Sequence, residues 1–301
     1  MKKQEPIQSV VAYASSNILG EGPVWHDERQ SLLWVDIEGQ FIHELKWPGK
    51  EVEMWQMPQR IGMLAVENKN EVMVALQHGL AKFNLETKEL EWVSEIEKDI
   101  NTNRPNDGKC DVKGRLWLGT MDLECNKDSG SLYCIEKDLS VTQKLTGLTI
   151  SNGLAWSLDG KRLYFIDSST YKIECYLFNA DMGTIAFEKT VINVPVNMGM
   201  PDGMTIDEEG MLWIAHWNGF AVYRWNPYTG GLLDKIPLPV PQVTSCTFGG
   251  ENLDVLFITT AKVGLNEEQL LQYPLSGHVF VAQPGVKGSV ANKFGSINTK
   301  I

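Results

Sequence analysis

Short runs of apolar residues recur along the chain at nearly constant intervals. The centres of six such runs are residues 34, 74, 117, 164, 213 and 257. Turn-forming Asp, Asn and Gly residues precede most of these runs, a pattern typical of strands joined by short hairpin loops. The spacing of about 45 residues matches one blade of a β-propeller, so the chain is predicted to be all-β.

Each repeat is long enough for four strands. In the fifth repeat, apolar runs at 212–214, 220–225 and 232–236 are separated by short loops that include an Asn-Pro and a Thr-Gly turn. Six such units predict a six-bladed β-propeller with four-stranded antiparallel blades. We expect one domain over residues 1–301, with one or two helical turns at 266–272.

The last repeat lacks a fourth strand, because the chain becomes rich in Gly and Lys after the run at 278–282. The apolar stretch at about 8–14 belongs to no repeat. We expect this N-terminal stretch to pair as the outer strand of the last blade and close the ring, which also protects an edge. The tail after about residue 285 is expected to be loosely held.

A polar residue followed by glycine stands in register with four repeats, 11–13 residues before the centre of the apolar run. The signatures are Glu21-Gly22-Pro23, Asn106-Asp107-Gly108, Ser151-Asn152-Gly153 and Pro201-Asp202-Gly203, and their ring residues are Glu21, Asn106, Asn152 and Asp202. The other two repeats carry Gly62 and Ser245 at the equivalent positions. Equivalent positions in a propeller lie at the same end of the innermost strands, so we predict that all six face one mouth of the central channel. Gly62 and Ser245 would leave room for a substrate to enter.

Carboxylate and amide oxygens gathered at one mouth suit a divalent cation. Glu21 and Asp202 would supply two negative charges and Asn152 a neutral carbonyl oxygen, a set that fits Ca²⁺, Mg²⁺ or Mn²⁺, and Zn²⁺ also accepts carboxylates. Any one signature is also typical of a turn, so the prediction depends on all four being in register. Arg104, two residues before Asn106, is a candidate contact for a substrate hydroxyl or carboxylate, and an ordinary surface arginine is the alternative.

Composition narrows the expected partners and location. The 301 residues carry a formal net charge of −11, which disfavours nucleic acid and anionic membranes as partners. No apolar run approaches the roughly 18 residues of a membrane span, and no signal peptide is recognisable, so we expect a cytoplasmic monomer or small homo-oligomer. The five cysteines are odd in number and lack CxxC spacing, which predicts reduced, mostly buried thiols.

The motifs around these polar residues resemble those of the family of regucalcin (senescence marker protein), gluconolactonases and luciferin-regenerating enzyme. The matching segments occur in family order at 19–25, 104–109, 114–121, 150–154 and 201–204, and segments at 239–250 and 259–261 resemble the bacterial sugar-lactonase branch. The resemblance implies a propeller with one divalent metal ion bound by Glu21, Asn152 and Asp202. It also implies substrate contacts from Arg104, Asn106 and an acidic residue after Gly-Thr-Met.

That acidic residue is Glu124 by position, but the local sequence departs from the family pattern, so Asp122 is the alternative. The predicted reaction is hydrolysis of a sugar lactone such as gluconolactone (an aldono-1,4- or 1,5-lactone), with the metal as Lewis acid and Asp202 as general base. Ca²⁺ and Zn²⁺ are expected ahead of Mg²⁺ and Mn²⁺, and loop 122–130 is expected to act as a lid.

Three other functions remain open at this point. The chain could be a calcium-binding regulatory protein of the regucalcin type without catalysis. It could be a phosphotriesterase-like hydrolase, because the same metal site accepts either electrophile. It could also be a protein-interaction scaffold, for which a polar metal site in the channel would not be needed.

Overall fold

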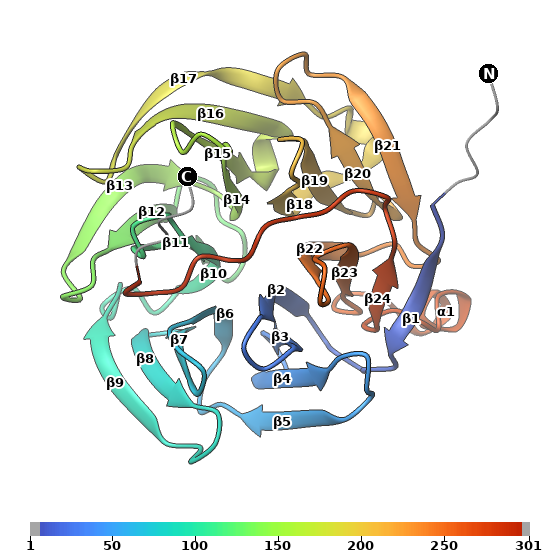
Figure 1. Ribbon diagram of the computed structural model, residues 1–301, viewed down its shortest axis with the longest axis horizontal. Coiled ribbons are helices and arrows are strands. Elements are labelled where there is room, and N and C mark those ends of the chain that lie inside the picture. The colour runs from blue at the N-terminus through green and yellow to red at the C-terminus, as the bar shows by residue number, and fades with distance from the viewer. Residues whose placement is uncertain (1–6, 297–301) are drawn as a thin grey trace.

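Six four-stranded antiparallel sheets surround a central channel in the computed structural model, which describes residues 7–296 (Figure 1). The predicted all-β, six-bladed propeller is therefore confirmed. Within these residues the one α-helix is α1 (Glu267–Gln272), which Asn266 caps in the predicted region. Two 3-10 turns, η1 (Ser168–Thr170) and η2 (Val196–Met198), complete the helical content of the described chain. No helix in residues 7–296 has the length and apolarity needed to cross a membrane.

The blades follow one another in chain order, each running from its innermost to its outermost strand. Blades one and two contain β2 (Gly20–His26), β3 (Ser31–Asp36), β4 (Phe41–Lys46), β5 (Val52–Gln56), β6 (Ile61–Val66), β7 (Glu71–Leu76), β8 (Gly79–Asn84) and β9 (Leu90–Glu95). Blades three and four contain β10 (Asn103–Cys110), β11 (Leu116–Asp122), β12 (Gly130–Ile135), β13 (Val141–Leu148), β14 (Ser151–Trp156), β15 (Arg162–Asp167), β16 (Lys172–Asn179) and β17 (Thr184–Asn193). Blades five and six contain β18 (Met200–Ile206), β19 (Leu212–Trp217), β20 (Ala221–Trp225), β21 (Leu232–Pro237), β22 (Val243–Gly249), β23 (Val255–Thr260), β24 (Val279–Ala282) and β1 (Ser9–Tyr13).

The apolar runs that revealed the repeat are the second strands of the blades. Every residue of β3, β11 and β23 is buried, because both faces of these strands pack against other parts of the protein. Burial on both faces produces continuous apolar runs instead of the alternation seen in half-exposed strands. Trp117 and Trp213 are fully buried, and their indole N–H groups donate to Asp111 and Asp207 in the preceding turns, each at 2.9 Å.

The polar-glycine signatures lie where each innermost strand changes its pairing register. In β14 the shift falls between Ser151 and Leu154, and the other five innermost strands have a shift at the equivalent place. Such irregularities re-aim side chains and are often found near functional sites. A Cβ atom on Gly153 would lie 2.7 Å from the backbone oxygen of Asp202, so glycine is required for the two neighbouring strands to approach.

The N-terminal strand closes the ring as predicted. β1 pairs antiparallel with β24, with Ser9 opposite Ala282 and Val11 opposite Phe280, and it forms the outer edge of the last blade. The last blade therefore combines strands from both ends of the chain, which ties the two ends of the repeat array together.

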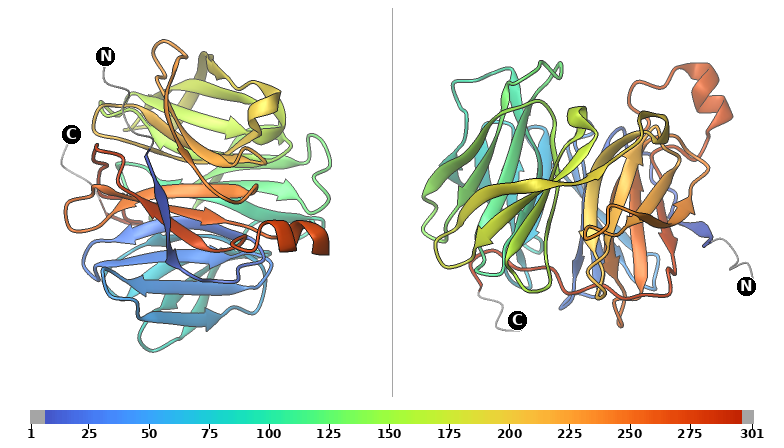
Figure 2. Two further views of the ribbon diagram at one scale, coloured as in Figure 1. Left: turned by 90° about the vertical axis from the view of Figure 1, so that its right-hand side faces the viewer. Right: turned by 90° about the horizontal axis from the view of Figure 1, so that it is seen from above.

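The C-terminal tail is not loosely held, contrary to the expectation from its composition. Residues 284–296, here called the C-terminal strap, cross the channel on the face opposite α1 (Figures 1 and 2). The backbone N–H of Gly288 donates to Leu253 and that of Phe294 to Val66, at 2.9 and 2.8 Å. The side chain of Phe294 is 2% exposed and packs in the core between blades two and three. Lys293 adds ion pairs with Asp27 and Glu28 at 2.9 and 2.7 Å. The strap is therefore held by backbone hydrogen bonds, ion pairs and an aromatic anchor, none of which produces a strand pattern in the sequence. Residues 297–301 lie outside the described residues.

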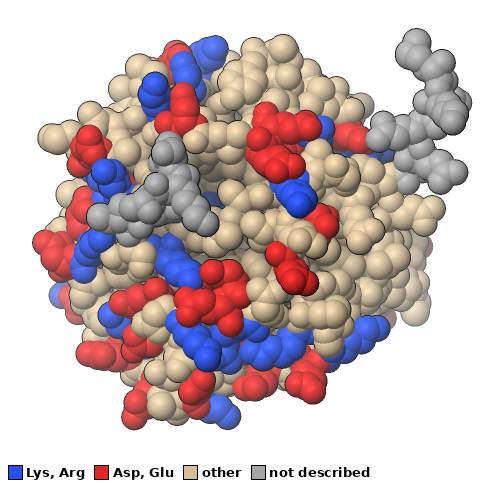
Figure 3. All heavy atoms as spheres, in the orientation of Figure 1, with Lys and Arg blue, Asp and Glu red and all other residues tan. Residues whose placement is uncertain are grey.

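Charged side chains of both signs are interspersed on the face that the strap crosses (Figure 3).

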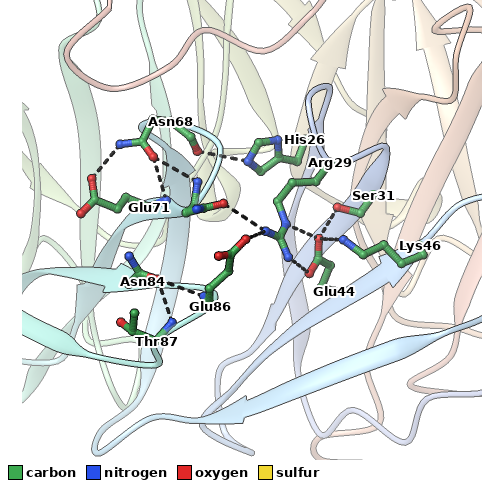
Figure 4. Close-up of polar contacts among 11 residues, drawn as sticks. His26, Arg29, Ser31, Glu44, Lys46, Asn68, Glu71, Asn84, Glu86 and Thr87 are labelled. Carbon is green, nitrogen blue, oxygen red and sulfur yellow. Dashed lines mark hydrogen bonds and ion pairs between the residues drawn. The ribbon is translucent and has the colours of Figure 1, made fainter.

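Figure 4 shows a cluster at the junction of blades one and two, where Arg29 binds the buried Glu44 through two hydrogen bonds of 2.8 and 2.9 Å. Burial opposes the ionisation of Glu44, but hydrogen bonds from Arg29, Lys46 and Ser31 lower its pKa to about 2. Arg29 also forms an ion pair of 3.6 Å with Glu86 of blade two, so this cluster joins adjacent blades.

We predict that Phe294→Ala lowers the free energy of unfolding by about 3 kcal/mol, because it removes a buried aromatic side chain and leaves a cavity. Val290→Ala is the matched control, since Val290 belongs to the same strap but is 41% exposed. Urea unfolding of the two variants measures the difference. Equal, small losses of stability would show that the strap is not anchored by Phe294.

Candidate active site

A cavity of about 290 Å³ lies at the mouth of the channel opposite the C-terminal strap. The strap contacts hairpin turns that follow the innermost strands, whereas the cavity is lined by residues at the beginnings of these strands. The structure brings five of the six predicted site residues together in its wall, from blades one, three, four and five: Glu21, Arg104, Asn106, Asn152 and Asp202.

Two buried carboxylates form the charged centre of this cavity. Glu21 is 7% and Asp202 is 6% exposed. Burial, with a further contribution from the negative charge of Asp107, raises the pKa of Glu21 to about 8. Burial and the charge of Glu21 raise the pKa of Asp202 well above its usual range, and the neighbouring Asn152 amide opposes this shift. The carboxylates therefore lack enough positive charge nearby to be ionised together, and a divalent cation would supply it.

Asn152 leaves an oxygen unpaired next to these carboxylates. Its amide nitrogen donates to Ser168 Oγ at 3.0 Å, and Ser168 Oγ donates to the backbone oxygen of Pro201 at 2.6 Å. Asn152 Oδ1 is buried and has no hydrogen-bond partner among the described residues. A buried, unpaired carbonyl oxygen is costly unless a ligand satisfies it, so this atom fits a cation ligand.

The donor set favours a hard cation. In residues 7–296 no group of three or more His, Cys, Asp or Glu side chains is placed to hold a metal ion. The candidate set is instead two carboxylates and one amide oxygen, which is the chemistry of Ca²⁺, Mg²⁺ and Mn²⁺ sites, and Zn²⁺ accepts carboxylates as well. Three protein ligands also leave coordination positions free for water or a substrate.

Arg104 and Asn106 form a preorganised pair on β10. Arg104 Nη1 donates to Asn106 Oδ1 at 2.6 Å and to the backbone oxygen of Pro105 at 2.9 Å. Asn106 Nδ2 in turn donates to the backbone oxygen of Ser151 in blade four at 2.8 Å. Both hydrogen bonds of the Arg104 guanidinium within residues 7–296 come from Nη1, so its Nε and Nη2 remain for a ligand. Burial lowers the pKa of Arg104, and the charge of Glu38 opposes that shift.

The structure does not bring Glu124 into the cavity wall. Glu124 is exposed on the loop between β11 and β12, and the loop residues that line the cavity are its neighbours Leu123 and Cys125. The alternative, Asp122, is buried, and its Oδ1 accepts hydrogen bonds from the backbone N–H groups of Glu124 and Asn126 at 2.8 and 3.3 Å. Asp122 therefore stabilises the conformation of the loop through these hydrogen bonds and does not line the cavity.

The interpretation of Gly62 and Ser245 as an open side of the ring is wrong. In blade order they lie on either side of Glu21, not next to each other. A Cβ atom on Gly62 would lie 2.4 Å from the backbone oxygen of Pro105, so the neighbouring strand fills that space. Ser245 lines a second chamber, deeper in the channel, that the strap covers.

Three site features were not predicted from the sequence. Ser168 orients Asn152, but it follows a second strand and shares no motif with the ring. Glu38 lines the cavity and pairs with Arg60 at 3.0 Å. Asp107 and Lys109 line the deeper chamber, where Lys109 Nζ donates to the backbone oxygen of Met204 at 2.8 Å. The sequence shows that Asp107 is a polar residue of the Asn-Asp-Gly signature, but it does not show that Asp107 lines a second chamber.

Comparisons with known proteins extend over most of the chain. The family model described as "SMP-30/Gluconolactonase/LRE-like region" matches residues 19–262. Regucalcin of Xenopus laevis is 34% identical over 282 residues, which cover 92% of this chain and 94% of that protein. YvrE of Bacillus subtilis (strain 168), provisionally named a sugar lactone lactonase, is 34% identical over 266 residues, 88% of this chain and 91% of that protein. The crystal structure of a calcium-binding protein, regucalcin, from Agrobacterium tumefaciens str. C58 has a TM-score of 0.93 at 27% identity and covers 97% of this chain and 98% of that one.

We predict that a divalent cation raises the melting temperature of chelator-treated protein, because the ion binds the folded carboxylate pair and not the unfolded chain. At a concentration 100-fold above Kd the stabilisation should be about 2.7 kcal/mol. Glu21→Gln and Asp202→Asn should each abolish the shift. Glu38→Gln is the control, since that cavity carboxylate already pairs with Arg60. A full shift in Glu21→Gln would remove Glu21 from the ligand set.

Proposed function

Because the chain belongs to the SMP-30/gluconolactonase/LRE-like family, we propose that it is a metal-dependent hydrolase that opens sugar lactones. The observation that carries this proposal is the grouping of Glu21, Asn152 and Asp202 with the Arg104–Asn106 pair in one cavity. A scaffold protein would gain nothing from two buried carboxylates whose pKa values are both raised by burial and by nearby negative charge. The likeness to the Bacillus subtilis relative supports a lactone ring as the group that reacts.

Glu21, Asn152 and Asp202 would hold one divalent cation, with Ca²⁺ or Zn²⁺ preferred over Mg²⁺ or Mn²⁺. When bound, the cation supplies Lewis-acid polarisation of the lactone carbonyl and stabilisation of the negative charge that develops on its oxygen. Ser168 keeps the Asn152 amide oriented so that Oδ1, not Nδ2, is presented. A misoriented amide would place N–H donors toward a cation.

Asp202 acts as the general base. One carboxylate oxygen takes a proton from the attacking water, whose oxygen forms the new bond to the carbonyl carbon. The same carboxyl group returns the proton to the ring oxygen as the ring C–O bond breaks, which gives the open hydroxy acid. Arg104 binds the sugar hydroxyls through Nε and Nη2, and Asn106 holds the guanidinium in place, so the ring is oriented before the reaction.

A calcium-binding regulatory role is the second candidate, because the similar Agrobacterium protein is described as calcium-binding. The two functions differ in a measurable way. A regulator binds Ca²⁺ reversibly without releasing acid from lactones, whereas the proposed hydrolase releases acid with at least one of the four metals. A pH-indicator assay over a lactone panel, after chelation and metal add-back, distinguishes them.

We predict that Asp202→Ala abolishes turnover, because the variant loses both a metal ligand and the general base. Initial-rate measurements at saturating metal test this. A kcat close to that of the unmodified protein would rule out the mechanism. Asp202→Asn, which keeps the size of the side chain, separates the loss of charge from the loss of packing.

We predict that Asn106→Ala mainly raises KM, by about tenfold, with a smaller change in kcat. The substitution removes the acceptor that fixes Arg104 Nη1, and a hydrogen bond to a charged group contributes about this factor. Steady-state kinetics give the two constants separately. A loss confined to kcat would place Asn106 in the reaction itself instead of in substrate orientation.

A further inference from the structure

A second set of side chains lies one step closer to solvent than the candidate metal ligands. Successive side chains on a strand point to opposite faces, so the residue two positions before each ring residue points into the same channel. Leu19, Ile150 and Met200 precede Glu21, Asn152 and Asp202 in this way, and all six line the cavity. Arg104 stands in the same relation to Asn106. The ring residues therefore form a polar floor of the cavity, and the residues two positions before them form its rim.

The rim is apolar over most of its circumference. Met121 forms a β-bridge with Ile150, which joins the end of blade three to the start of blade four. We define the apolar wall by the six cavity residues that follow from there around the mouth to blade one: Met121, Ile150, Met200, Trp217, Val263 and Leu19. The polar part of the rim is confined to the opposite edge, where Glu38 and Arg104 stand on either side of blade two.

The polar side chains that line the cavity beneath the apolar wall are already engaged. The single hydroxyl proton of Ser168 is donated to the backbone oxygen of Pro201, and its oxygen accepts from Asn152. Glu21, Asn152 and Asp202 are committed to the cation. Apart from the Trp217 indole N–H, the wall carries only aliphatic and thioether side chains. A substrate hydroxyl placed against these side chains would lose its hydrogen bonds to water without replacing them, whereas a methyl group would gain contacts.

Apolar surface continues outward from the wall. Ile18, Val196 and Phe220 are 39%, 71% and 38% exposed. Each lies within four residues of a member of the wall, and Phe220 packs edge-on against Tyr273 with ring centroids 5.4 Å apart. Exposed apolar side chains thus stand next to wall residues along the chain, together with Lys262, whose Nζ donates to Ser16 Oγ at 2.6 Å.

We propose that the preferred substrates are deoxy-sugar lactones, in which the ring hydroxyls face Arg104 and Glu38 and a terminal methyl group lies against the apolar wall. This inference rests on the proposed lactone hydrolysis and specifies its substrate class. The hydroxyl-rich edge of the lactone is recognised by charge-assisted hydrogen bonds and the opposite edge by apolar contact. The terminal hydroxymethyl group of an ordinary hexonolactone meets a wall in which the Trp217 indole N–H is the one strong side-chain donor among the six residues.

Matched substrate pairs test the proposal directly. L-Rhamnono-1,4-lactone and L-mannono-1,4-lactone differ only in a terminal methyl against a hydroxymethyl group, and L-fucono- and L-galactono-1,4-lactone form a second pair. We expect kcat/KM of the metal-loaded protein to be about tenfold or more higher for the deoxy member of the pair that is turned over. Equal values, or preference for the hydroxymethyl member, would overturn the inference while leaving lactone hydrolysis intact. Absence of acid release from every lactone with every metal would instead overturn the proposed function, and this inference with it.

A substitution in the apolar wall tests whether the preference for deoxy lactones arises there. Met200→Gln adds hydrogen-bonding groups with little change in size, so it should reduce the preference for the deoxy lactone about fivefold or more. Met182→Gln is the matched control, because Met182 is 70% exposed in the turn between β16 and β17. Melting temperatures show whether either variant is unfolded, and in that case Ile150→Thr replaces Met200→Gln. An unchanged preference in the folded wall variant would contradict the assignment of this wall.

Discussion

The close approach of neighbouring innermost strands around the channel is the constraint on which the site depends. Gly153 lies against the backbone of Asp202, and Gly203 lies so close to Ser245 that a Cβ atom would collide with its side chain. Gly153 and Gly203 therefore have a packing role that is separate from turn formation, whereas Gly22 is required by its positive φ of 53°. If these strands were farther apart, carboxylate and amide oxygens from different blades would not meet at one point. The same contacts fix the position of each blade relative to the next.

This approach places charge where it is unfavourable without a partner. Glu21 and Asp202 are buried together, and the raised pKa of each reflects the desolvation of its carboxylate and the negative charges nearby. Arg104 also lines the cavity and lowers the pKa of both carboxylates, but its effect is smaller than that of burial and of the nearby negative charges. A divalent cation, if it binds as proposed, would offset this unfavourable burial of negative charge, and its binding would then depend on the geometry of the cavity.

Closure of the ring supports that geometry from both ends of the chain. β1 completes the last blade on the outside, and the C-terminal strap spans hairpin turns on the face opposite the cavity. The strap also covers the deeper chamber that contains Asp107 and Lys109. The cavity with Glu21 and Asp202 thus opens on one face, and the deeper chamber is covered on the other.

The repeat and the ring of polar residues could be predicted from the sequence, because both follow from a periodic strand pattern in which equivalent positions must coincide in space. The family resemblance, which the comparisons bear out, rested on the same residues. Ser168 could not be found in this way, since it acts on Asn152 across a strand pair and belongs to no repeated position. The strap was misjudged because its contacts, which are backbone hydrogen bonds, the ion pairs of Lys293 and the buried Phe294, follow no strand or helix period in the sequence. The position of Glu124 depended on a loop whose path the repeat does not determine.

The most direct test of the central claim is anomalous diffraction from crystals of the protein soaked with Mn²⁺ or Zn²⁺. The account predicts one strong anomalous peak at the mouth of the channel, within coordination distance of a Glu21 carboxylate oxygen, Asn152 Oδ1 and an Asp202 carboxylate oxygen. A peak confined to the deeper chamber beside Asp107, or no peak in the channel at saturating metal, would contradict it.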